Sequence, residues 1–191
     1  FGLYSFAWTS STFLHMFGSA ISRATFPEIS NVTSGGDTQD AAPILQDALR
    51  YGGLILVPGL AGAAIVGPRI LRMYGPEFTA GRTVLIILAT AVLFRSYQQQ
   101  LVTALNAVDR PDLTFRVNAV SVASNLILNL ALIYYYGWVG AAVATALASA
   151  IRLGLAYRYT AALIDFSLPY TMLGKQTLAA FVTGAVAYGT L

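Results

Sequence analysis

Polar side chains interrupt the apolar segments of this chain at spacings that place them on shared helix faces. Arg95 lies in the middle of an apolar segment, and Gln98 and Gln99 follow it one turn later. A second stripe recurs at intervals of three, four and four residues, at Asn118, Ser121, Asn125 and Asn129. A guanidinium binds phosphate or carboxylate through paired hydrogen bonds, and amides bind hydroxyl groups. These residue types predict a hydrophilic, positively charged cavity for an anionic, hydroxyl-rich molecule.

The candidate cavity residues are therefore the polar side chains inside apolar segments: Arg95, Gln98, Gln99, Arg23, Asn118, Asn125 and Asn129. The alternative for each amide is a hydrogen bond between helices with no binding role. The alternative for Arg95 is a structural partner on another helix. No catalytic or metal-binding set is expected, because the eight acidic residues lie in loops or at helix ends and the chain has one His and no Cys. We expect no cofactor.

Composition determines the class of protein that must position these residues. The 191 residues are 57% hydrophobic and 10% charged, whereas soluble domains carry about 25% charged residues. Residues 117–151 contain no charged side chain and break once, at Tyr136-Gly137-Trp138. That length suits two membrane-spanning helices of about 20 residues joined by a tight turn. The net charge of +3 comes from dispersed basic residues, so we expect no nucleic-acid partner.

The chain divides into six apolar segments, which predict an all-α, polytopic transmembrane helix bundle. We expect helices at roughly 3–30, 49–74, 82–107, 112–136, 138–160 and from Pro169 onward, with a polar loop at about 31–48. Gly140, Ala144 and Ala148 recur every four residues, a spacing that lets membrane helices approach closely. The first residue is Phe and the last apolar run has no polar flank. We therefore expect residues 1–191 to be a single helical lobe, truncated at both ends.

The basic residues predict the orientation of this multi-pass protein in the plasma (cytoplasmic) membrane. If successive loops alternate sides, seven basic residues lie near one side: Arg23, Arg50, Arg110, Arg116, Arg152, Arg158 and Lys175. Three lie near the other: Arg69, Arg72 and Arg82. Because basic residues accumulate on the cytoplasmic side, we expect the 31–48 loop to be cytoplasmic and the turn at residues 134–138 to face outward.

Several short motifs, taken in order, resemble a known family. They are residues 24–30 (ATFPEIS), 67–78 (GPRILRMYGPEF), 104–111 (ALNAVDRP), 125–129 (NLILN) and 136–142 (YGWVGAA). Their order and spacing resemble the C-terminal half of polysaccharide and lipid-linked oligosaccharide flippases, in the superfamily that also holds the MATE multidrug exporters. The resemblance covers nearly the whole chain.

The resemblance implies a two-lobed transporter with a central cavity, in which an N-terminal lobe of the same full-length chain is a partner. It implies that a polyprenyl- or dolichyl-linked oligosaccharide crosses the membrane by alternating access, for surface polysaccharide or glycoprotein glycan assembly. Within the family, basic cavity residues are expected to meet the lipid phosphate, and Arg95 and Arg23 are the candidates.

Two other functions remain open at this stage. A cation-coupled small-molecule antiporter of the same superfamily would require a carboxylate within a span, and none lies there. A membrane-embedded glycan polymerase or ligase would require a large outward loop with reactive side chains, and the expected outward loops are short. We therefore expect a transporter and not an enzyme. The sequence does not define an oligomeric state.

Overall fold

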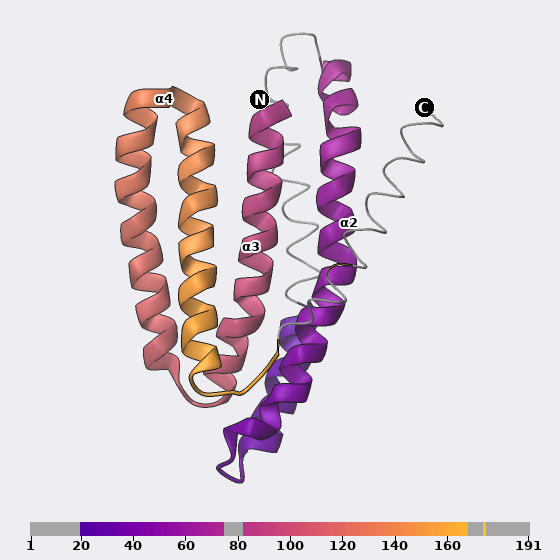
Figure 1. Cartoon of the computed structure of the whole chain (residues 1–191), viewed down its shortest axis with the longest axis vertical. Helices are drawn as coiled ribbons and strands as arrows, with labels where there is room; N and C mark the ends of the chain where they lie inside the picture. Colours follow the sequence, from indigo (N-terminus) through magenta and orange to yellow (C-terminus); the bar gives the residue numbers. More distant parts are fainter. Residues whose placement is uncertain (1–19, 75–81, 168–173, 175–191) are drawn as a thin grey trace.

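The computed structural model describes residues 20–74, 82–167 and 174, and all structural statements below concern these residues. A helix covers residues 20–33 and is followed by the 3-10 helix η1 (Thr38–Ala41) and the long helix α2 (Ala42–Tyr74). Helices α3 (Arg82–Ala107) and α4 (Pro111–Ala161) follow (Figure 1). The described part contains no strand, which confirms the all-α fold class. The start of the first expected helix, and the expected helix from Pro169, lie outside the described residues.

Helix α4 reverses its direction at Gly137 and forms a hairpin of two antiparallel legs (Figure 1). We call residues 111–136 the first leg and residues 138–161 the second leg. Gly137 has φ 58° and ψ −139°, a combination that is open to glycine and strained for other residues. The two helices expected at 112–136 and 138–160 are thereby confirmed, with the break at the expected turn.

Small residues bring the second leg against its neighbours. Ala144 and Ala148 are buried, and α4 makes its main contacts with α3. Gly140 is buried one turn after the reversal, where an added Cβ would overlap the backbone carbonyl of Leu132 on the first leg. The absence of a side chain at Gly140 therefore lets the two legs meet directly beside the turn.

The overlap at Gly140 predicts a measurable cost for a single methyl group. Gly140→Ala should lower the free energy of unfolding by about 1–3 kcal/mol, because the backbone of Leu132 must move away. Gly154→Ala is the matched control, since no atom lies within 4 Å of its added Cβ. Thermal unfolding of the full-length protein in detergent measures both. Equal midpoints for the two variants would contradict the close approach of the legs.

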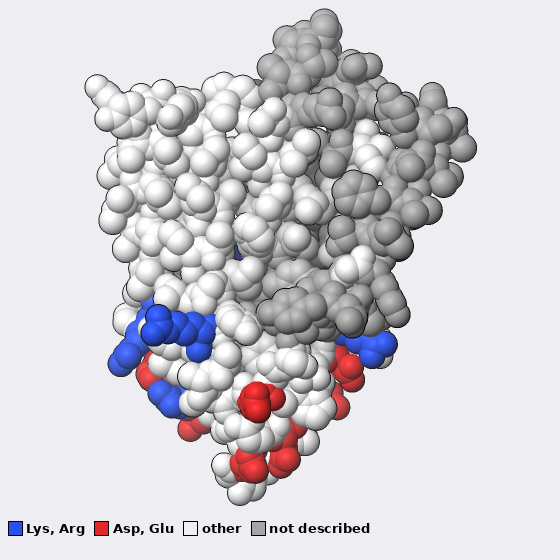
Figure 2. Space-filling model, in the orientation of Figure 1, with Lys and Arg blue, Asp and Glu red and all other residues white. Residues whose placement is uncertain are grey.

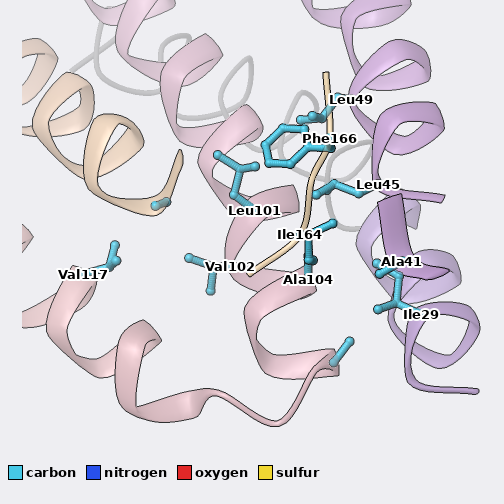
Figure 3. Close-up of a cluster of buried hydrophobic side chains, with 12 residues drawn as sticks. Ile29, Ala41, Leu45, Leu49, Leu101, Val102, Ala104, Val117, Ile164 and Phe166 are labelled. Atoms are coloured by element: carbon cyan, nitrogen blue, oxygen red, sulfur yellow. The ribbon is translucent and has the colours of Figure 1, made fainter. Parts of the chain in front are cut away.

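A hydrophobic cluster holds the helices together at one end of the bundle (Figure 3). This end carries the loops at residues 34–37, 108–110 and 162–167, and we call it the charged end. The cluster draws residues from every described helix and from the segment after α4: Ile29, Ala41, Leu45, Leu49, Leu101, Val102, Ala104, Ala107, Val117, Ala156, Ile164 and Phe166. Since Ile164 and Phe166 are buried, the segment after α4 belongs to the core.

The polar loop is shorter than expected. α2 begins at Ala42, inside the segment 31–48 that the sequence analysis assigned to a loop, and the preceding helix continues to residue 33. The reason is that the first part of α2 is amphipathic. Leu45 and Leu49 face the cluster, while Asp47 and Arg50 are exposed. Burial of this apolar stripe stabilises helical turns that the local polarity did not suggest.

Side-chain hydrogen bonds fasten the first loop to the segment after α4. Thr38 Oγ1 and Gln39 Nε2 both donate to the Leu163 carbonyl, at 2.9 and 3.2 Å. Gln39 Oε1 accepts from the backbone N–H of Asp165 at 2.7 Å. These bonds join residues more than 120 positions apart, so they close the charged end of the bundle.

Gln39 is therefore the side chain whose loss should loosen the charged end. Gln39→Ala removes one donor and one acceptor and should lower the free energy of unfolding by about 1–2 kcal/mol. Asp40→Ala, an exposed neighbour, should change it by less than about 0.5 kcal/mol. Chemical or thermal unfolding in detergent compares them, and an equal loss in both variants would show that the Gln39 bonds add no stability.

Candidate functional site

A pocket of about 460 Å³ lies where α3 faces the two legs of α4. One α3 residue lines it together with residues of both legs: Arg95, Ser121, Val122, Asn125, Leu126, Asn129, Thr145, Ala148, Ser149 and Arg152. The pocket thus combines arginine, amide and hydroxyl side chains with a few apolar ones. No acidic residue is among its described lining.

The hairpin register brings a polar stripe on each leg to the same pocket. On the first leg the stripe includes Ser121, Asn125 and Asn129. On the second leg Thr145, Ser149 and Arg152 follow at intervals of four and three residues, which places them on one helix face. The Nη2 of Arg152 donates to Asn118 Oδ1 at 2.6 Å, so the two stripes also touch one another.

Hydrogen bonds along each helix already engage several polar groups in the pocket. Thr145 Oγ1 donates to the Ala141 carbonyl at 2.9 Å, and Ser149 Oγ donates to the Thr145 carbonyl at 2.8 Å. Asn129 Nδ2 donates to the carbonyl and to Oδ1 of Asn125, at 2.8 and 3.0 Å. These groups therefore have their donors occupied, while their oxygens keep capacity to accept a hydroxyl group.

Donors that remain in the pocket belong to the two guanidinium groups, to the Asn125 amide and to the Ser121 hydroxyl. The Nε of Arg152 is buried and has no hydrogen-bond partner, although its Nη2 is bound to Asn118. Arg95 reaches the same pocket, and among the described residues it has no ion pair. The pocket is therefore cationic, and its two like charges are uncompensated by any described lining residue.

The structure brings together some of the candidate residues and separates others. Arg95, Asn125 and Asn129 line the pocket, and Asn118 joins it through Arg152. Arg23 is exposed on the helix at residues 20–33, and it does not line the pocket. Gln98 and Gln99 are also outside the lining; Gln98 is 1% exposed, with neither amide atom hydrogen-bonded. A cavity role for these three residues stays a prediction.

Sequence reasoning missed the second-leg half of the pocket. The sequence-based prediction of the cavity does not include Thr145 or Ser149, and it uses Arg152 only as one of the basic residues that mark the cytoplasmic side. Their spacing with Arg152 is the same signal that identified the asparagine stripe on the first leg.

Charged side chains gather at the charged end of the molecule in the view of Figure 2, and the described surface above them is uncharged. The described ion pair is there, with Arg110 Nε 3.0 Å from an oxygen of Asp112. The hydrogen bond from Arg110 lowers the pKa of the Asp112 carboxyl. The exposed pair therefore stabilises the fold above the ordinary pKa of an aspartate, and this contribution is lost as the pH falls through the lowered pKa.

The outer surface of α4 is apolar. By length and composition alone, one helix among the described residues, Pro111–Ala161, is able to cross a membrane. Leu130 on the first leg is 69% exposed, and Tyr134 near the turn is 83% exposed. Side chains of this kind suit lipid, and aromatic rings at the turn suit the interface. Among the described residues no cluster of His, Cys, Asp or Glu could hold a metal ion.

Comparison with known proteins places this fold in a family. The family model described as "Lipid II flippase MurJ" matches residues 3–191. The chain is 34% identical to the probable flippase AglR of Haloferax volcanii over its full length, and 31% identical over 98% of its length to the probable low-salt glycan biosynthesis flippase Agl15 of the same organism. It spans 40% of the length of each of these two relatives.

A solved structure shows the same fold. The lipid II flippase MurJ in an inward closed conformation matches 97% of this chain with a TM-score of 0.79, at 21% identity, and the match covers 41% of that protein. Together with the apolar helices and the family match, this fold identifies an integral membrane protein of the cytoplasmic membrane. The chain belongs to the MurJ family of lipid II flippases.

Proposed function

We propose that this chain is the C-terminal lobe of a flippase that moves a polyprenyl- or dolichyl-linked oligosaccharide across the membrane by alternating access. Such transport would serve surface polysaccharide or glycoprotein glycan assembly. The proposal places the protein in the MATE-like superfamily, with an N-terminal lobe of the same full-length chain as its partner. The family match and the names of the two Haloferax relatives support it.

The observation that carries the proposal is the cationic, polar pocket between α3 and the two legs of α4. An arginine in the centre of a membrane helix costs about 2.5–3.5 kcal/mol even on insertion scales. A hairpin that served only as packing would avoid that cost with apolar side chains. Arg95 and Arg152 instead face one pocket with the asparagine stripe, which suits the phosphate and sugar hydroxyls of a lipid-linked glycan.

The pocket favours transport over the two other functions. A cation-coupled antiporter needs a carboxylate that binds its cation, and the described pocket lining has none. A glycan polymerase or ligase needs reactive groups, whereas the described pocket offers guanidinium, amide and hydroxyl groups that bind without forming bonds. The protein would then be a transporter and not an enzyme.

Arg95 should be required for transport. In the full-length protein, Arg95→Ala should lower the initial flipping rate of a fluorescent lipid-linked oligosaccharide in proteoliposomes at least about tenfold, because an anionic group loses a charged hydrogen-bond partner. Arg95→Lys should retain part of the rate, since it keeps the charge and loses the paired geometry.

Arg158→Ala is the matched control, because Arg158 is an exposed arginine in the last turn of α4 and outside the pocket lining. It should transport at the wild-type rate. Normal transport by Arg95→Ala would give Arg95 a structural or snorkelling role. Failure of Arg95→Ala to accumulate in the membrane would make Arg95 a structural partner of another helix, and failure of the wild type to flip the lipid would contradict the flippase itself.

The proposed orientation has the charged end in the cytoplasm. A cysteine at Ser34, in the exposed loop before η1, or at Asp109, in the loop before α4, should resist an impermeant thiol reagent in intact cells. A cysteine at Tyr135, which is 75% exposed beside the hairpin turn, should react. Labelling in a cysteine-free full-length background, with and without permeabilisation, measures the difference. The reverse pattern would invert the topology.

A further inference from the structure

We propose that Gln98 takes part in the transport cycle, because its side chain changes its hydrogen-bond partners between two conformations of this lobe. In the conformation described above its amide is buried without a partner. In the second conformation α3 has rotated about its axis and the amide is paired. The inference rests on the proposed function, since alternating access requires at least two conformations. It assigns a role to a side chain outside the pocket lining.

The first observation is the burial of Gln98 without a partner. The residue is 1% exposed, and neither its Nε2 nor its Oε1 has a hydrogen-bond partner within the described part of the chain. A primary amide offers two donor hydrogens and an oxygen that accepts twice. Burial of such a group without partners costs free energy, and the cost rises where the dielectric constant is low. Gln98 therefore raises the free energy of this conformation.

Other buried polar side chains along this stretch of α3 and beside it are paired. Gln100 is 3% exposed, and its Oε1 accepts a hydrogen bond from Ser22 Oγ at 3.3 Å. Thr160 is fully buried, and its Oγ1 donates to the Leu101 carbonyl at 3.4 Å. The packing around α3 therefore allows hydrogen bonds to neighbouring helices. The exception concerns the side of α3 that carries Gln98, which lies about 160° around the helix from Gln100.

The second observation is the place of Gln98 relative to Arg95, which reaches the pocket from α3 three residues earlier. Three residues of an α-helix set two side chains about 60° apart around the axis and about 4.5 Å apart along it. Rotation of α3 by about 60° would therefore turn Gln98 towards the side on which Arg95 now lies. Ser121 and Asn125 offer hydroxyl and amide groups on that side. The same rotation displaces Arg95, so pairing of Gln98 is coupled to a change at the pocket.

The neighbouring surfaces permit this movement. α3 lies between α2 and α4 in Figure 1 and contacts both. Ala144 and Ala148 are buried on the second leg, and Ala91 is buried on α3. Small residues let membrane helices approach closely, and a surface of methyl groups has lower ridges than one of interlocked long side chains. A helix can turn across such a surface against few steric obstacles.

Gln98→Met is the first test, because methionine resembles glutamine in length and volume and has no amide to leave unpaired. For the full-length protein in detergent, the melting temperature should rise by about 2 °C or more. In proteoliposomes, the initial flipping rate of a fluorescent lipid-linked oligosaccharide should fall at least about fivefold, because this conformation becomes more stable relative to the second one. A side chain with a structural role alone would not combine a higher melting temperature with slower transport.

Gln100→Met is the matched control on the same helix. It removes the bond to Ser22, so its melting temperature should fall. A higher melting temperature in both variants would show that any buried glutamine in α3 is unfavourable, which removes the special status of Gln98. A lower melting temperature in Gln98→Met would show that the amide is paired in this conformation, and the proposal would be wrong.

The reactivity of a cysteine at position 98 reports the second conformation directly. In a cysteine-free full-length background, Gln98→Cys should react with a small water-soluble thiol reagent while the protein transports the lipid-linked oligosaccharide in proteoliposomes. Gln100→Cys should stay protected, because its side of α3 faces the helix at residues 20–33. Protection of both cysteines, or equal reaction of both, would contradict a rotation that exposes position 98 alone.

Failure of this inference and failure of the proposed function have different signatures. If the wild type flips the lipid and Gln98→Met does so at the wild-type rate, the role of Gln98 is wrong and the flippase stands. If the wild type flips no such lipid, but a cysteine at position 98 reacts while one at position 100 stays protected, the second conformation stands and the proposed function is wrong.

Discussion

The reversal of α4 at Gly137 is the constraint on which the candidate site depends. Two antiparallel legs have a fixed register, so the position of the turn decides which residues meet in the interior of the membrane. Gly137 adopts a backbone conformation that other residues reach only with strain, and Gly140 lets the legs approach until a side chain would collide with Leu132. A turn displaced by one residue would rotate each leg by about 100° relative to the other and separate the two polar stripes. The contact between Asn118 and Arg152 is the direct result of this register.

The groups that stabilise the lobe and the groups that line the candidate pocket lie in different parts of the structure. The hydrophobic cluster and the Gln39 hydrogen bonds gather at the charged end, where every described helix and the segment after α4 contribute buried residues. The pocket lies between α3 and the two legs of α4 and contains groups that are costly to place in a membrane. Because the cluster fixes the base of the hairpin, α3 and the second leg can each carry one unneutralised arginine at the pocket without losing their packing against one another.

The sequence predicted the helices better than it predicted the contacts between them. Apolar length gave α3 and both legs of α4, because a membrane-spanning helix must satisfy its own backbone and therefore has a characteristic length. The start of α2 was missed, because Leu45 and Leu49 gain their burial from a cluster that forms only in the folded lobe. Arg95 and Asn125 were found from their spacing on single helices. Arg152 was missed because its role depends on the register of the other leg, and Gln98 was grouped with Arg95 because helical spacing cannot tell which neighbour a face of α3 meets.

The hydrogen-bond partner of Arg152 also bears on the proposed function of the pocket. A structural arginine in a membrane protein is normally paired with a carboxylate, which neutralises it and removes its ability to bind an anion. In this hairpin the partner is the amide of Asn118, and no acidic side chain is among the described residues that line the pocket. An amide directs the guanidinium but leaves its charge intact. The hairpin thus maintains a positive potential in a region of low dielectric constant, where it attracts an anion more strongly than the same charges would in water. Such a potential would have no use in an element that serves only for packing, and it supports the proposed transport of an anionic, lipid-linked molecule.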